Sequence, residues 1–359
     1  MKAAPVLRAL AAHKGVEQTL VHTGQHYDDA MSGVFFAQLE MPAPDCNLEV
    51  GSGTHAQQTA GVMLALEPVL LERKPDLVLV YGDVNSTVAA AMVCAKLGIR
   101  VGHVEAGLRS RDRSMPEEIN RLLTDQLSDL LFTPSADADE NLKREGVDVV
   151  KIHLVGNVMI DTLIRLLPKA PQNFSQATQP YALVTLHRPS NVDDLPWLRD
   201  LLATLEDLSG QLHVIFPVHP RTRGRLEELG ANSVSVRDNG ARLHLLDPQP
   251  YLEFLSLQRG AALVITDSGG IQEETTFLGV PCLTVRENTE RPITLRLGTN
   301  QLVGRDLRRL RSAAAEILAQ DSTRQSSTRA AHLPDPNRVP LWDGHSSERI
   351  AEVILRSRS

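Results

Sequence analysis

Three acidic residues in the first half of the sequence follow apolar segments that have the composition of β-strands. Asp83 stands at the end of one such segment, in YGDVNST, and Glu105 ends the next, in GHVEAGLRS. Glu117 follows twelve residues later, in the first turn of a helix expected to begin at MPEEINR. Singly, each acid has a structural explanation, because helix caps and first turns favour acids. Together at one edge of a sheet, the three carboxylates are suited to general acid and base chemistry.

The second half carries groups suited to holding an anion. The segment ITDSGGIQEE places Ser268, Gly269 and Gly270 at a helix start, where backbone N–H groups and the helix dipole favour a diphosphate. No GKS or GKT follows, and the spacing is not GxGxxG, so neither a P-loop nor a nicotinamide cofactor is indicated. Glu274 on the same helix is a candidate acceptor for ribose hydroxyls. Phe254 is a candidate to lie against a base, although core packing is the commoner fate of a phenylalanine.

Two further polar segments follow expected strands. His187 and Arg188 lie in VTLHRP, just after an expected strand. Contact with a phosphate or leaving group is about as probable there as a structural role. Arg286, Glu290 and Arg291 cluster in RENTERPIT. This segment fits a loop that lines a cleft, and a solvated surface ion pair is an equal alternative.

The elements that must position these residues alternate between strand-like and helix-like runs, which is typical of a parallel α/β fold. We predict a first Rossmann-like domain at 1–165, a linker rich in Pro, Gln and Ser at 166–180, and a second Rossmann-like domain at 181–340. The segment 341–359 is expected to form a helix that packs back on the first domain. Two doubly wound domains would face a central cleft, where such sheets bind ligands. The alternative is one large sheet with additional elements.

Length and composition fit a bilobal globular protein. The chain has 359 residues, more than one hydrophobic core usually serves, and its net charge of -7 has the wrong sign for a nucleic-acid binder. Its three cysteines, Cys46, Cys94 and Cys282, form no CxxC pair, so we expect no metal site and a reducing, cytoplasmic setting. No apolar stretch is long enough to predict a membrane span.

Taken together, the motifs YGDVNST, GHVEAGLRS, MPEEINR, VTLHRP, DSGGIQEE and ENTERPIT resemble those of the non-hydrolysing UDP-N-acetylglucosamine 2-epimerase family, as does the closing LWDGHSSERI. The resemblance covers nearly the whole chain and implies the GT-B type of fold, two Rossmann-like domains facing a cleft. It also implies no cofactor, a homodimer formed through the first domain, and a role in polysaccharide biosynthesis. By motif position, the resemblance implies that four residues are catalytic: Asp83, Glu105, Glu117 and His187. It implies that a second set binds the substrate: Lys2, Arg188, Phe254, Ser268, Gly269, Gly270, Glu274, Glu290 and Arg291.

The activity that this resemblance implies is interconversion of UDP-N-acetylglucosamine and UDP-N-acetylmannosamine, by elimination of UDP to 2-acetamidoglucal and its re-addition. Alternatives are a GT-B glycosyltransferase, a hydrolysing epimerase and a binding protein for UDP-sugars without turnover. Gln25 and His26, in TGQHYDD, are candidates for a regulatory site. A plain turn is the commoner explanation there.

The start of the sequence departs from this pattern. Members of the family open with an apolar strand and a GTRPE-type glycine loop that holds a phosphate-binding arginine, whereas this sequence opens at KAAP, inside the helix that follows. In a sheet of order 3-2-1-4-5-6 the first strand is central, so the strands on either side would lack a partner without it. We favour a truncated sequence over a degenerate, inactive relative. We therefore expect the chain as written to be poorly stable and weakly active, and an added strand and loop to restore both.

Overall fold

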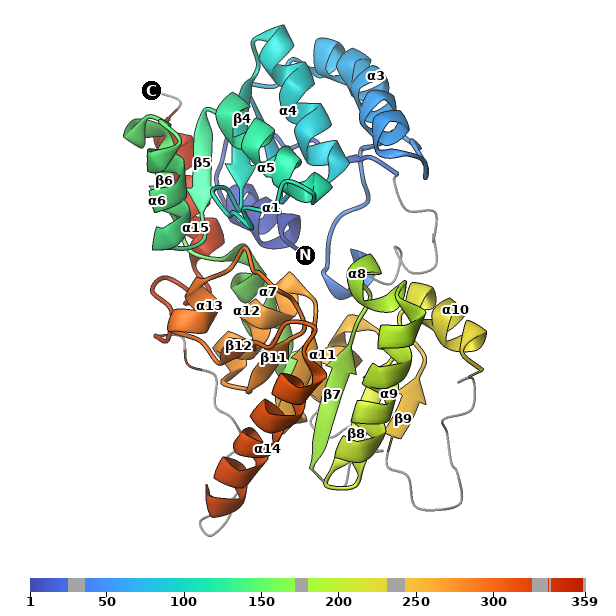
Figure 1. The fold of residues 1–359 in the computed structure, drawn as a ribbon. Helices are drawn as coiled ribbons and strands as arrows, with labels where there is room; N and C mark the ends of the chain where they lie inside the picture. The colour runs from blue at the N-terminus through green and yellow to red at the C-terminus, as the bar shows by residue number, and fades with distance from the viewer. Residues whose placement is uncertain (25–35, 172–179, 231–242, 325–334, 336, 358–359) are drawn as a thin grey trace. The chain divides into compact units, whose positions relative to one another are not determined.

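The computed structural model describes residues 1–24, 36–171, 180–230, 243–324, 335 and 337–357 (Figure 1). The chain divides into two compact units. Unit 1 consists of Met1–Ile164 and Pro340–Ser359, and unit 2 of Arg165–Val339. Both units are built on parallel sheets flanked by helices, so the predicted α/β fold class is confirmed.

The main sheet of unit 1 has four parallel strands in the order β3-β4-β5-β6. These strands are β3 (Leu77–Tyr81), β4 (Arg100–Val104), β5 (Leu130–Thr133) and β6 (Ile152–Leu154). Two short strands, β1 (Val21–His22) and β2 (Cys46–Asn47), pair with each other in a separate sheet. In the described part of the chain, therefore, β3 has a strand partner on one side only, which is β4.

The strands of unit 1 are accompanied by six helices among the described residues before the linker. They are α1 (Ala3–Ala11), α3 (His55–Arg73), α4 (Asn85–Leu97), α5 (Pro116–Leu127), α6 (Ala136–Arg144) and α7 (Val158–Leu166). Helix α3 begins with a capping box between Thr54 and Gln57, and α4 ends at Gly98, whose φ of 70° a glycine adopts without strain. Helix α4 packs against both α3 and α5 (Figure 1). Because α4 and α5 follow β3 and β4 in the chain, their N-termini lie near the carboxyl ends of these strands.

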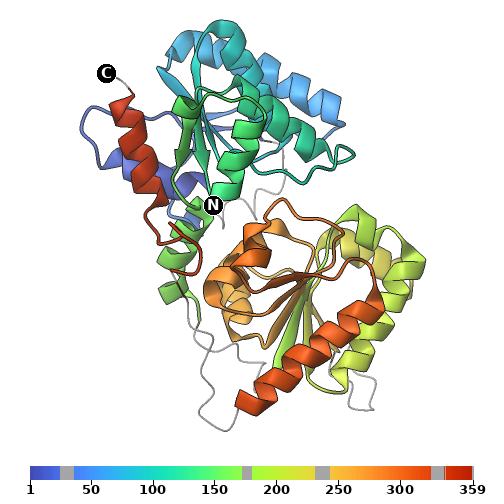
Figure 2. The same ribbon diagram turned by 60° about the vertical axis from the view of Figure 1, so that its left-hand side comes forward.

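The C-terminal segment belongs to unit 1. Helix α15 (Ser346–Arg356) packs beside α1, as Figure 2 shows for the red and blue ends of the chain. Its side chains Ile350 and Ile354 join a core with Val6 and Leu10. The buried carboxylate of Asp161 accepts hydrogen bonds from the first backbone N–H groups of α15, at 3.2 Å and 2.7 Å, and so caps this helix.

Unit 2 contains a six-stranded parallel sheet in the order β12-β11-β10-β7-β8-β9. Numbered within the unit, this is the Rossmann order 3-2-1-4-5-6, so the strand order reverses between β7 and β10, where such sheets bind ligands. The strands are β7 (Tyr181–Thr185), β8 (His213–Pro217), β9 (Leu243–Leu246), β10 (Leu263–Thr266), β11 (Cys282–Thr284) and β12 (Asn300–Leu302).

The helices of unit 2 are α8 (Pro189–Val192), α9 (Leu195–Ser209), α10 (Pro220–Glu228), α11 (Tyr251–Gly260), α12 (Gly269–Leu278), α13 (Ile293–Arg296) and α14 (Leu307–Arg324). Helices α9 and α14 pack together and share one core with the sheet (Figure 1). Helix α14 was not predicted from the sequence. Its buried stripe includes Leu310 and Ala314 among several arginines, which is a weak apolar signal. Within the described residues, no helix is long and apolar enough to cross a membrane.

Candidate active site

Two of the predicted acids lie on adjacent strand ends of unit 1. Strands β3 and β4 are paired so that Tyr81 stands opposite Val104, which places Asp83 and Glu105 just beyond neighbouring carboxyl ends. The N–H group of Gly82 donates to the Val104 carbonyl at 3.0 Å and extends this pairing to the turn itself. The two acids that lie far apart in sequence are therefore brought to one edge of the sheet.

Glu105 is held in an unusual conformation. Its φ is 76°, in a region that costs a residue with a side chain roughly 1–2 kcal/mol. Its side chain is only 4% exposed, and its carboxylate forms an ion pair with the ammonium group of Lys2. Such strain persists where the surroundings fix the conformation, and it is commonest at functional sites.

Gly82 makes room for this ion pair. Its φ is 67°, and a Cβ atom placed on it would lie 2.6 Å from the Lys2 Nζ and 3.4 Å from a carboxylate oxygen of Glu105. The side chain of any other residue would overlap with Lys2. The structure thus brings Lys2, Gly82 and Glu105 together at the turn that also carries Asp83.

Asp83 is paired with an arginine that the sequence analysis did not single out. The Arg121 guanidinium binds one carboxylate oxygen of Asp83 through Nε at 2.9 Å and Nη2 at 2.7 Å. Arg121 is buried, whereas the Asp83 side chain stays 25% exposed. Asp83 is thereby oriented but still accessible. Arg121 lies within the MPEEINR motif, and this position could have identified it as a site residue from the sequence.

The two glutamates of MPEEINR have different surroundings. Glu118 is buried and accepts hydrogen bonds from the backbone N–H groups of Ser110 and Arg111, at 2.9 Å and 2.8 Å, so it fixes the loop before α5. Glu117 is half-buried, and its carboxylate makes no hydrogen bond or ion pair within the described residues. It stands four residues before Arg121 on α5, and therefore on the same helix face as the partner of Asp83.

In unit 2, His187 and Asp267 form a pair at the point where the strand order reverses. They follow β7 and β10, in which Thr185 stands opposite Thr266. The Nδ1 of His187 lies 3.0 Å from the Asp267 carboxylate, which also accepts from the N–H groups of His187 and Arg188 and from Asn191. Because Nδ1 donates to Asp267, Nε2 is the nitrogen that can meet a ligand, and the His187 side chain is 40% exposed.

The charge of Asp267 is stabilised by these contacts. Burial would raise the pKa of its carboxyl, but the hydrogen bonds from His187, Arg188 and Asn191 outweigh that effect and hold the pKa below its usual value. Asp267 lies within the ITDSGGIQEE segment but was not predicted as a site residue. Its position directly after the expected strand and before Ser268 could have identified it from the sequence.

The glycine turn of unit 2 lies beside the RENTERPIT segment. Ser268 is the N-cap of α12, and a Cβ atom on Gly269 would lie 2.7 Å from the Glu290 carboxylate, so these two segments are in close contact. Glu290 forms ion pairs with Arg286, at 2.7 Å, and with Arg291. All three side chains are buried, which excludes the alternative of a solvated surface ion pair. Arg188 approaches the same carboxylate at 3.9 Å.

Other predicted nucleotide-binding residues lie on α11 and α12. Glu274 is buried and accepts a hydrogen bond from the Tyr251 hydroxyl at 2.9 Å. Burial raises the pKa of Glu274 to about 7, despite the opposing effect of that hydrogen bond. Phe254 is half-buried, three residues after Tyr251 on α11, and Gly270 is half-buried in the first turn of α12. Gln25 and His26 lie outside the described residues.

No cluster of three or more histidine, cysteine or acidic side chains in the described part of the chain has the arrangement to hold a metal ion.

Comparison with known proteins places the chain among nucleotide-sugar epimerases. The sequence model of one family, described as UDP-N-acetylglucosamine 2-epimerase, matches residues 8–355. A UDP-N-acetylglucosamine 2-epimerase of Methanococcus maripaludis is 42% identical, over 99% of this chain and 95% of its own. A UDP-2,3-diacetamido-2,3-dideoxy-D-glucuronate 2-epimerase of Pseudomonas aeruginosa is 40% identical, over 99% and 96%.

A solved structure agrees with these relatives. The crystal structure of Methanocaldococcus jannaschii UDP-GlcNAc 2-epimerase in complex with UDP-GlcNAc and UDP aligns with a TM-score of 0.87 and 40% identity, covering 99% of this chain and 96% of the other. The predicted GT-B type of fold is confirmed by this similarity. The chain belongs to the UDP-N-acetylglucosamine 2-epimerase family.

Proposed function

We propose that the chain interconverts UDP-N-acetylglucosamine and UDP-N-acetylmannosamine without net hydrolysis. The observation that carries this proposal is the placement of Asp83 and Glu105 on adjacent strand ends of unit 1, each paired with a cation. Family membership supports the reaction class, and a solved relative is described as a complex with UDP-GlcNAc and UDP.

The chemistry explains why several carboxylates are needed. The hydrogen on C2 is not next to a carbonyl group, so it becomes acidic only when the C1–O bond breaks. The electron pair of that bond goes to the diphosphate, and positive charge develops at C1. A carboxylate then takes the C2 proton, and the C–H electron pair forms the C1=C2 bond of 2-acetamidoglucal.

The return step inverts the configuration. A proton is delivered to the opposite face of C2, and a diphosphate oxygen attacks C1, so the net change is an isomerisation with no oxidant and no water consumed. Proton exchange on two faces requires more than one acid, and we propose Asp83, Glu105 and Glu117 for these roles and for stabilising the positive charge. Each well-placed general acid or base contributes about 10²- to 10⁴-fold.

In this proposal, unit 2 holds UDP. His187, oriented by Asp267, and the N–H groups at the start of α12 meet the charge that develops on the departing diphosphate. One well-placed donor to such an oxyanion contributes about 2.7–4 kcal/mol. Glu274 and Phe254 are proposed to contact ribose and uracil.

The test is an incubation of the protein with UDP-N-acetylglucosamine in heavy water. An epimerase places deuterium at C2 of both UDP-sugars, which mass spectrometry and NMR detect. A glycosyltransferase leaves C2 unlabelled, a hydrolysing epimerase releases free N-acetylmannosamine and UDP, and a binding protein retains UDP without labelling. Any of these three outcomes contradicts the proposal.

Matched variants connect the reaction to the site. Glu105→Gln and Asp83→Asn should lower the labelling rate by about 10²-fold or more, since each removes a carboxylate without changing its shape. Glu72→Gln on α3 is the control, because Glu72 is exposed and lies outside the site. Equal rates for all three variants would exclude Asp83 and Glu105 as catalytic residues.

The relative from Pseudomonas aeruginosa favours a second candidate substrate. It is as similar to this chain as several UDP-N-acetylglucosamine epimerases, and its described substrate is UDP-2,3-diacetamido-2,3-dideoxy-D-glucuronate. The reacting C2 centre is the same in both sugars. Comparison of kcat/KM for the two UDP-sugars decides between them, and we expect the higher value for UDP-N-acetylglucosamine.

We also propose a homodimer formed through unit 1. On α3, Leu64 and Leu71 are 76% and 56% exposed and lie two turns apart on one face. Exposed apolar side chains of this kind are common at interfaces between subunits. Leu71→Glu should convert a dimer to a monomer in sedimentation velocity, whereas Val150→Glu, at another exposed apolar position, should not. A wild-type monomer would refute the proposal.

A further inference from the structure

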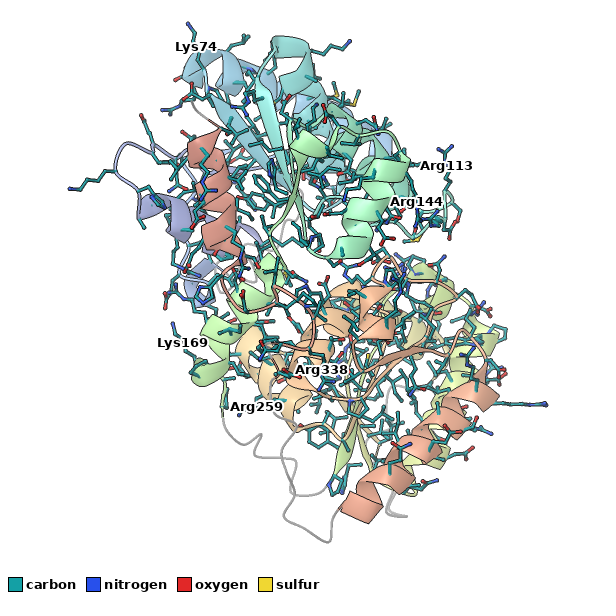
Figure 3. The ribbon with its side chains drawn as sticks, turned by 90° about the vertical axis from the view of Figure 1, so that its left-hand side faces the viewer. Lys74, Arg113, Arg144, Lys169, Arg259 and Arg338 are labelled. Carbon is teal, nitrogen blue, oxygen red and sulfur yellow. The ribbon has the colours of Figure 1, made fainter. Side chains whose placement is uncertain are left out.

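A group of four charged side chains, three of them buried and the fourth exposed, contacts the two acid-bearing turns of unit 1. It consists of His103 on β4, Asp125 on α5, Arg109 in the loop after β4, and Glu145 just after α6. His103 and Asp125 are fully buried. The same loop carries Arg113, which is exposed and labelled in Figure 3, so burial of an arginine here is particular to Arg109. None of the four residues was assigned a role above.

The contacts of His103 link the turn that carries Asp83 to Asp125. Its Nε2 lies 2.8 Å from the Gly82 carbonyl oxygen, and its Nδ1 lies 2.6 Å from Asp125 Oδ1. A carbonyl oxygen can only accept, so Nε2 carries a hydrogen. The neighbouring carbonyls are held as well, because Thr87 donates to the Tyr81 carbonyl and Asn120 to that of Asp83, both at 2.9 Å.

The other oxygen of Asp125 reaches the turn that carries Glu105. Asp125 Oδ2 accepts from the Gly107 N–H at 3.1 Å and pairs with Arg109 Nη1 at 2.7 Å. Arg109 in turn forms two hydrogen bonds to Glu145, at 2.8 Å and 2.6 Å. Gly107 cannot be replaced without displacement, since a Cβ atom there would lie 2.6 Å from the Ala138 carbonyl oxygen.

The charges of this group are compatible with its burial. Desolvation would raise the pKa of Asp125, but His103 and Arg109 outweigh it and hold that pKa below its usual value. An ionised carboxylate can only accept, so the Nδ1 of His103 donates to Asp125 as its Nε2 donates to the Gly82 carbonyl. The buried guanidinium of Arg109 thus lies between the carboxylates of Asp125 and Glu145, and a buried charge that loses its partner is strongly destabilising.

We propose that His103 and Asp125 are positioning residues for the epimerisation, which hold the Gly82–Asp83 turn and the Glu105–Gly107 turn at a fixed separation. This inference rests on the proposed function. One carboxylate reaches both turns, through the imidazole to the Gly82 carbonyl and directly to the Gly107 N–H. Because Glu105 has a positive φ, its orientation depends on such external contacts.

The predicted effect is on kcat. Displacement of a reacting group by about 1 Å costs about 10²-fold in rate. Loss of either contact of His103 should therefore lower kcat by about 10- to 100-fold and leave KM unchanged, since substrate contacts are not altered.

Variants of His103 separate its two contacts. The amide nitrogen of glutamine takes the place of the imidazole Nε2, so His103→Gln keeps a donor to the Gly82 carbonyl and loses the one to Asp125. The amide nitrogen of asparagine takes the place of Nδ1, so His103→Asn keeps the donor to Asp125 and loses the one to Gly82. His103→Leu removes both, and Asp125→Asn alters the shared acceptor.

The measurement is kcat and KM for C2 labelling, at a temperature well below each variant's thermal midpoint. We expect His103→Gln and His103→Asn to lie between wild type and His103→Leu in kcat. His153→Gln on the edge strand β6 is the control and should keep wild-type kcat. If His103→Leu does not fold, the glutamine and asparagine variants carry the test.

The outcomes separate the inference from the proposed function. If wild type and His153→Gln label C2 while folded His103→Gln, His103→Asn and Asp125→Asn do so with wild-type kcat, the group has only a structural role and the inference is wrong. If wild type itself does not label C2, the proposed function fails instead.

Discussion

The turn at Gly82 allows one prediction in which backbone strain and loss of activity are separated. In Gly82→Ala the new Cβ atom would lie 2.6 Å from the Lys2 Nζ, a distance that real Cβ contacts do not show, so the ammonium group of Lys2 has to shift from its position beside Glu105. Gly98→Ala is a matched control. Gly98 has a φ of 70°, close to the 67° of Gly82, but a Cβ atom there would meet nothing within 4 Å.

The cost in stability should be similar for the two substitutions. An alanine in the left-handed region costs roughly 1–2 kcal/mol, and a change of 1 kcal/mol shifts the thermal midpoint by roughly 2–4 °C in a domain of 150–250 residues. Both variants should therefore melt roughly 2–8 °C below wild type, as measured by differential scanning calorimetry.

Only Gly82→Ala should lose activity in addition to stability. The shifted ammonium group no longer fixes the carboxylate of Glu105 in its present position, and we expect kcat for C2 labelling to fall by about 10²-fold. Gly98→Ala should keep wild-type kcat below its midpoint. If Gly82→Ala has the same thermal midpoint as Gly98→Ala but retains the wild-type kcat, the Lys2–Glu105 contact does not position Glu105 for catalysis. Our reasoning about this turn is then refuted.

Three other perturbations test the site. Arg121→Gln leaves the buried carboxylate of Glu118 without its cation and should lower the free energy of unfolding by about 3–5 kcal/mol in urea titrations; a loss below 1 kcal/mol would contradict the burial argument. Asp267→Asn removes the acceptor that orients His187 and should lower kcat by about 10²-fold, with UDP affinity by calorimetry as the second readout; unchanged kcat would exclude this pair from leaving-group stabilisation. The pKa of Glu274 is raised to about 7 in the folded state, so its contribution to stability is fully present below the unfolded value and is lost as pH rises through about 7. Between pH 4.5 and 7.5, the free energy of unfolding of the unliganded wild type should thus fall by on the order of 3 kcal/mol relative to that of Glu274→Gln. If the free energies of unfolding of the two proteins change with pH in parallel, Glu274 is not buried as an acid.

The sequence by itself determined the fold class and the positions of the main candidate residues. Apolar runs alternate with amphipathic ones, and an acid or histidine that follows an apolar run lies at the carboxyl end of a parallel strand. Asp83, Glu105 and His187 were identified in this way, because the signal lies within a few residues of each. Helix α14 was not predicted, because its buried stripe is narrow and lies among arginines.

Only the tertiary structure decided which partner each of these residues has. Arg121 binds Asp83 from 38 residues away, Asp125 binds His103 from 22, and Asp267 binds the backbone of His187 from 80. Such pairings depend on strand register and on how a helix docks, and neither is encoded in local spacing. For the same reason the sequence could not tell Glu117 from Glu118. Both stand in the first turn of α5, but the rotation of that helix buries one carboxylate in the loop and leaves the other without a partner in the described residues.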